Sequence, residues 1–99
     1  MAKPITWQPK PLRQIQALED YFLNEIGSVQ ALDNFLEKLD FISKYPTVGR
    51  PTGRKNIRYI KVDDHRSIFY RIFTNHLLII LLWDSRQHPD KNPFLKKKR

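Results

Sequence analysis

An arginine stands just beyond the end of an almost wholly apolar run, in the sequence Asp84-Ser85-Arg86. The run covers residues 77–83, which is too short to span a membrane but has the length and composition of a buried strand. Arg86 is therefore expected at the rim of a rigid sheet, where a cation can be held ready to bind a phosphate. His88 follows closely and could give or accept a proton near neutral pH, although a lone histidine in a loop is more often simply solvated.

The rest of the charge pattern also points to an anionic partner. The formal net charge is +8 over 99 residues, with a pI near 10.0, which favours nucleic acid, an anionic membrane surface or an acidic protein. Residues 45–55 read as a loop that carries Arg50, Arg54 and Lys55. These cations could contact a nucleic-acid backbone or could be ordinary solvated surface, and the same two alternatives hold for the basic end of the chain.

Other chemistries have little support in the sequence. There are no cysteines, and the three histidines are far apart in the sequence, so we expect no metal site and no cofactor. The length suits one domain, residues 1–99, with residues 94–99 as a basic tail. Without an apolar signal region or a run of membrane-spanning length, a cytoplasmic protein is expected.

Two helices are predicted in the first half, beginning with Pro9 and Pro11 in the first turn. The first apolar stripe consists of Leu12, Ile15, Leu18, Phe22 and Ile26. Gly27 and Ser28 suit the end of one helix and the start of the next, whose stripe consists of Val29, Leu32, Phe35, Leu36, Leu39 and Ile42. Tyr45-Pro46 should end the second helix, which completes a helical hairpin with both stripes in the core.

Three strand-like segments follow, at residues 56–62, 66–74 and 77–83, and the short gaps between them predict an antiparallel meander. The third is apolar on both faces and should be central, with one face under the helices and the other partly covered. The predicted fold class is thus α+β, an N-terminal helical hairpin packed on a small antiparallel sheet. Trp7, Tyr59 and Tyr70 are expected to fill the core, and stacking on bases is their other possible role.

The order of these parts resembles the RelE/ParE superfamily of toxins from bacterial toxin–antitoxin modules, over nearly the whole chain. The likeness is carried by a Pro-x-x-Gly-Arg loop (Pro46, Gly49, Arg50), a His-Arg-x-Ile-x-Tyr strand start (His65, Arg66, Ile68, Tyr70) and an Arg-Gln-x-Pro element (Arg86, Gln87, Pro89). It implies the toxin of a type II module, held inactive by a cognate acidic antitoxin. Within the superfamily one branch cuts mRNA in the ribosomal A site, and the other poisons DNA gyrase without known hydrolytic chemistry.

For the cleaving branch the resemblance assigns phosphate-holding positions to Arg66 and Arg86. The preceding strand supplies lysines in that branch, and the nearest cations here are Arg58 and Lys61. Arg66 could instead form an ion pair with a nearby aspartate, at position 63, 64 or 84. A two-residue turn at 63–64 would bring Lys61 opposite Arg66 on one sheet face, whereas a three-residue turn would separate them.

One departure weakens the case for cleavage. Many cleaving members carry a tyrosine or histidine near the C-terminus for proton transfer or base stacking, but residues 90–94 of this chain are Asp-Lys-Asn-Pro-Phe, which leaves His88 as the only local substitute. The strand "HRSIFYR" also looks more like the gyrase-poisoning branch.

The sequence-based hypothesis is a ribosome-dependent, metal-independent mRNA endonuclease. Its proposed catalytic residues are Arg66, Arg86, Lys61 and His88, and its proposed RNA contacts are Arg50, Arg54, Lys55, Arg58 and Lys91. The alternatives are a gyrase inhibitor, or an inactive family member that only binds its antitoxin.

Overall fold

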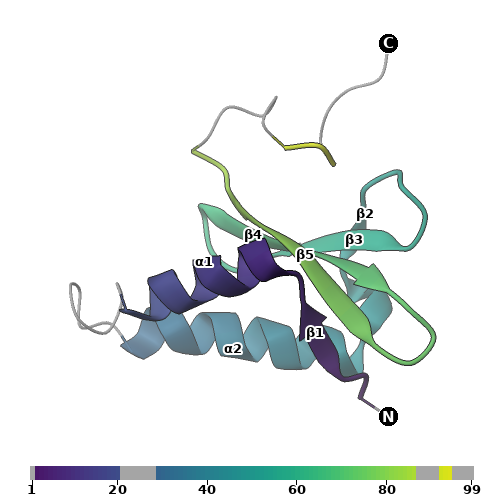
Figure 1. The fold of residues 1–99 in the computed structure, drawn as a ribbon, viewed down its shortest axis with the longest axis horizontal. Helices are drawn as coiled ribbons and strands as arrows, with labels where there is room; N and C mark the ends of the chain where they lie inside the picture. Colours follow the sequence, from purple (N-terminus) through teal and green to yellow (C-terminus); the bar gives the residue numbers. More distant parts are fainter. Residues whose placement is uncertain (1, 21–28, 87–91, 95–99) are drawn as a thin grey trace.

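The computed structural model describes residues 2–20, 29–86 and 92–94. Within these residues the chain forms two helices, α1 (Pro9–Asp20) and α2 (Val29–Lys44), and a short 3-10 turn, η2 (Pro46–Val48). The strands are β1 (Ile5–Trp7), β2 (Arg50–Pro51), β3 (Ile57–Lys61), β4 (Arg66–Ile72) and β5 (Leu77–Asp84). The two helices run in opposite directions beside the sheet (Figure 1). The predicted α+β fold class is confirmed.

The strands form one sheet in the order β1-β5-β4-β3-β2. The three predicted strands and their antiparallel meander are confirmed, and β5 lies between two neighbours, as its apolar composition predicted. Two edge strands were not predicted as part of the sheet. β1 pairs with β5 in parallel, and β2 forms inside the segment expected to be a loop. The sheet is therefore mixed and not purely antiparallel.

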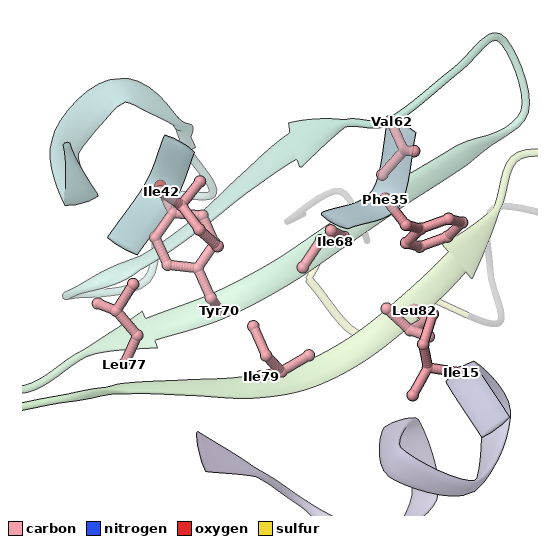
Figure 2. Packing of buried hydrophobic residues seen from close by; sticks show 9 residues of the cluster. All are labelled: Ile15, Phe35, Ile42, Val62, Ile68, Tyr70, Leu77, Ile79 and Leu82. Carbon is pink, nitrogen blue, oxygen red and sulfur yellow. The ribbon is translucent and has the colours of Figure 1, made fainter. Parts of the chain in front are cut away.

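The core lies between one face of the sheet and the helices. Ile15 of α1 and Phe35 and Ile42 of α2 are buried against that face. Figure 2 shows how they converge with side chains from the sheet and the turn after β3: Val62, Ile68, Tyr70, Leu77, Ile79 and Leu82. None of the helices in the described ranges is long and apolar enough to cross a membrane.

Two residues of the predicted helix stripes are not in this core. Leu12 is 39% exposed and Leu36 is 53% exposed, so their assignment to the core was wrong. The stripes are wider than the surface that the sheet covers, and these two leucines lie at their outer edges. Phe22, Ile26, Gly27 and Ser28 lie outside the described residues, as do the side chains of Val29 and Leu32.

The opposite face of the sheet is partly covered, as predicted, but by aromatic side chains that include one from near the C-terminus. The ring of Phe69 is stacked between those of Tyr59 and Phe94, with centroid distances of 5.0 and 5.6 Å. Tyr59 belongs to this row and not to the core under the helices, which corrects its expected position. Tyr70 is in that core, and Trp7 packs against it from the edge strand.

The Pro-x-x-Gly-Arg loop is fastened to the sheet by a tyrosine hydroxyl. Tyr70 Oη donates a hydrogen bond to the carbonyl oxygen of Pro46 at 2.6 Å and accepts one from the backbone N–H of Gly49 at 3.1 Å. Arg58 Nη1 donates to the carbonyl oxygen of Gly49 at 2.7 Å. A Cβ atom at Gly49 would collide with the hydroxyl of Tyr70, so only glycine, which has no Cβ atom, fits at this position. This part of the motif therefore has a structural role.

Candidate functional site

The end of β5 and the start of β4 bring two arginines to one aspartate. Asp84 lies directly opposite Arg66 in the strand register, and Arg86 follows two residues later. Arg86 donates from Nε to Oδ1 of Asp84 at 3.0 Å and from Nη2 to Oδ2 at 2.6 Å. Its backbone N–H also donates to Oδ1, at 2.9 Å. This fork of two parallel hydrogen bonds is the strongest geometry available to an arginine and a carboxylate.

The electrostatics of Asp84 follow from that geometry. The side-chain hydrogen bond from Arg86 lowers the pKa of Asp84 from 3.8 to about 2, against the opposing effect of partial burial. The positive charge of Arg66 acts in the same direction. Asp84 is consequently ionised at neutral pH and acts as the counterion of this pair of arginines.

The second arginine is paired with its own aspartate. Arg66 Nη1 lies 3.1 Å from Oδ2 of Asp63, with side chains that are 19% and 33% exposed. The other carboxylate oxygen of Asp63 accepts the backbone N–H groups of His65 and Arg66, both at 2.8 Å. Partial burial would raise the pKa of Asp63, but these backbone hydrogen bonds and the guanidinium outweigh it, so the pKa is lowered. The ion-pair alternative for Arg66 is thus observed.

The same backbone hydrogen bonds determine the turn between β3 and β4. Val62 donates its backbone N–H to the carbonyl oxygen of Arg66, which leaves residues 63–65 as a three-residue turn. An aspartate that accepts from the next two or three N–H groups favours such a turn. Lys61 is therefore opposite Ser67 and one position out of step with Arg66. Because successive side chains alternate between faces, Lys61 and Arg66 lie on opposite faces of the sheet.

The predicted RNA contacts do not gather around the two arginines. Arg58 is occupied by the loop carbonyl oxygens of Thr47 and Gly49. Arg50 is exposed on β2, Lys55 is exposed in the following turn, and Arg54 lies over the ring of Phe94. His88 and Lys91, the remaining predicted site residues, lie outside the described residues.

Two features of the site were missed in the sequence. Asp84 was considered as a partner of Arg66 but not of Arg86, although an Asp-x-Arg spacing at a strand end is itself a signal for a local fork. The hydrogen bonds of the Tyr70 hydroxyl could not be predicted from the sequence, because its partners are backbone groups far away in the sequence. Within the described ranges, the histidines, aspartates and glutamates form no cluster of three or more that could hold a metal ion.

The fold of the described residues is similar to that of a solved toxin–antitoxin structure. A solved structure described as the chromosomal ParDE toxin–antitoxin system from P. aeruginosa superimposes with a TM-score of 0.64 at 17% sequence identity, and the match covers 84% of this chain and 96% of that one. No curated protein sequence matches the chain.

The family itself is given by residues 5–89, which match the model of the ParE toxin of the type II toxin–antitoxin system parDE. The chain belongs to the ParE toxin family. A toxin of such a system has an antitoxin as its partner, so an antitoxin partner is implied here as well.

Proposed function

We propose that this ParE-family toxin arrests growth by binding and inhibiting DNA gyrase, and that it does not cut RNA. The observation that carries the proposal is the match of residues 5–89 to the ParE toxin. Within the superfamily that branch is the gyrase-poisoning one, which the resemblance in the sequence left as the alternative to mRNA cleavage. The proposal reverses the preference drawn from the sequence alone.

The charges at the end of the sheet support binding over cleavage. Attack of a 2′-hydroxyl on a phosphate needs cations directed at the charge that develops in the transition state. Arg66 and Arg86 are each ion-paired with an aspartate, at 3.1 and 2.6 Å, and an RNA phosphate entering between them would meet two carboxylates. Lys61, the third predicted catalytic cation, lies on the other face of the sheet.

We further infer that the antitoxin covers the apolar surface left exposed on the helices. Leu12 on α1 and Leu36 on α2 are large aliphatic side chains at the outer edges of the two stripes. An antitoxin segment that combines apolar anchors with acidic residues would bury these leucines and complement the net charge of +8. The antitoxin is thus expected to be acidic.

The experiment is expression of the chain alone in cells, followed by mapping of what fails first. Gyrase inhibition predicts DNA damage with intact mRNA. Ribosome-dependent cuts at A-site codons that disappear in the Arg86→Ala variant, but not in the exposed-surface control Arg13→Ala, would overturn the proposal in favour of cleavage. Unimpaired growth at a confirmed protein level would also overturn it, in favour of an inactive member that only binds its antitoxin.

A further inference from the structure

The sheet face opposite the helices combines aromatic rings with cations. In the strand register, Arg50 is opposite Tyr59, Tyr59 is opposite Phe69, and Lys61 is opposite Ser67. Residues directly opposite each other in antiparallel strands share a face, and so do residues two apart on one strand. Arg50, Tyr59, Lys61 and Phe69 therefore lie on one face, and Phe94 packs onto it from near the C-terminus.

The aromatic row on this face is ordered and partly accessible. The ring planes of Tyr59 and Phe69 differ by 17° and those of Phe69 and Phe94 by 25°, so the three rings are stacked in series. Phe69 is fully buried within the row, whereas Tyr59 and Phe94 at its ends are half-buried. The guanidinium of Arg54 lies 5.5 Å from the centroid of Phe94, and its Nη2 donates to the carbonyl oxygen of Pro93 at 3.4 Å.

The charged residues that the structure describes around the row are cations. Arg50, Arg54 and Lys61 are exposed, and Arg50 and Lys61 flank Tyr59. Among the strand residues described on this face, none is acidic. The aspartates 63 and 84 are engaged instead by Arg66 and Arg86. This face thus differs from the strand end with the two arginines, where each cation has its own carboxylate.

We propose that this cationic aromatic face binds single-stranded nucleic acid. A base stacks on Tyr59 at the end of the ring row, and the neighbouring phosphates contact Arg50 and Lys61. Single strands offer both partners at once, because every unpaired base has a free π-face and every nucleotide a negative charge. A peptide of acidic residues alone would satisfy the cations but would leave the aromatic row without a matching partner.

This inference goes beyond gyrase inhibition and does not depend on it. The binding is measured on the purified full chain without gyrase or ribosomes, so its failure leaves the proposed function standing. The probes are fluorescently labelled oligo(dT) and oligo(U) of about 12 nucleotides, within the range that single-strand-binding folds cover. Fluorescence anisotropy is recorded over a series of salt concentrations, with a DNA duplex of the same length beside them.

Two charge-matched double variants test the cations. Arg50→Gln with Lys61→Gln removes two charges from the proposed face, and Lys10→Gln with Arg13→Gln removes two exposed charges from α1. Loss of two phosphate contacts on a single strand should lower the slope of log affinity against log salt concentration by about 1.4. The α1 variant should keep the wild-type slope. Equal weakening in both variants would overturn the proposal, because it would indicate attraction by net charge alone.

Substitutions of Tyr59 test whether a base stacks on its ring. Tyr59→Leu should weaken binding about tenfold without changing the salt slope, since it removes the π-face and keeps an apolar side chain against Phe69. Tyr59→Phe keeps the ring and should bind like the wild type, and thermal melts confirm that each variant is folded. Binding of either strand in this pattern supports the proposal, and the ratio of the two affinities assigns DNA or RNA. Tighter binding of the duplex, or binding of a glutamate-rich peptide but of neither strand, would overturn it.

Discussion

Asp84 and Arg86 form a bidentate ion pair at the end of β5, with hydrogen bonds of 3.0 and 2.6 Å between the guanidinium and the two carboxylate oxygens. The pair fixes the orientation of Arg86, the first residue of the Arg-Gln-x-Pro element in the sequence. Since Arg66 faces the same aspartate across the strands, one carboxylate influences both candidate phosphate-binding cations. The strand end is thus a neutralised cluster and not an open cationic site.

Removal of the Asp84 charge should turn this cluster into an anion-binding surface. In Asp84→Asn, Arg86 loses its ionic partner and Arg66 loses a neighbouring negative charge, so affinity for polyanions should rise. Elution from a heparin column is the measurement, and the variant should require more salt than the wild type. Asp64→Asn is the matched control, because it changes the net charge equally at an exposed position. Identical elution of the two variants would contradict the specific role of Asp84.

The same aspartate should make stability depend on pH in the acid range. Its pKa is lowered from 3.8 to about 2 in the folded chain, so its ionised form stabilises the fold above the unfolded-state pKa. That contribution is lost as the pH falls from about 4 through about 2. Arg86 is 59% exposed, so solvent screening limits the effect to about 1 kcal/mol. Urea unfolding over this range should show a flatter pH profile for Asp84→Asn, whereas a profile parallel to the wild type would argue against the pair.

The tyrosine that fastens the Pro46–Gly49 loop should be important for stability. Tyr70→Phe leaves the Pro46 carbonyl oxygen and the Gly49 N–H without their buried partner, at a cost of about 1–3 kcal/mol. Chemical denaturation measures this loss. Tyr45→Phe removes a hydroxyl from an exposed side chain and should cost almost nothing, which makes it the control. Equal stabilities for the two variants would rule out the proposed clamp.

The exposed leucine on α2, Leu36, should contribute to antitoxin binding. Leu36→Lys places a charge on a side chain that is 53% exposed, so folding should be little affected. If the antitoxin buries this residue, the complex should weaken by at least tenfold in calorimetric titration, as for loss of an apolar anchor. Glu37→Lys, at an exposed neighbouring position on α2, is the control. An unchanged dissociation constant for Leu36→Lys would exclude α2 from the interface.

The regular elements of this fold could be predicted because their signals are local. The patterns that predict β3, β4, β5 and the two helices lie in consecutive residues. The structure contains these strands with small shifts at their ends, and it contains both helices within the described residues. β1 is only three residues long and joins the sheet through a parallel pairing with Leu77–Ile79, which no local pattern encodes. The exposure of Leu12 and Leu36 likewise depends on how much of each helix the sheet covers.

The candidate site was harder to predict because the positions of its side chains depend on the register between β3 and β4 and on which charged groups form ion pairs. The sequence left two turns open between β3 and β4, and the carboxylate of Asp63 selects the three-residue one by accepting two backbone N–H groups. That choice moves Lys61 away from Arg66. Arg86 forms an ion pair with Asp84. That pairing depends on the conformation of the two side chains, which the amino-acid composition does not specify.

Gyrase inhibition is tested most directly by a supercoiling assay with purified gyrase, relaxed plasmid and the purified chain, run beside translating ribosomes that carry a labelled mRNA. The proposed function predicts that supercoiling falls as the chain is added and that the mRNA stays intact. Addition of the antitoxin should restore supercoiling. Full gyrase activity, together with A-site cuts in the mRNA that Arg86→Ala abolishes, would contradict the proposed function.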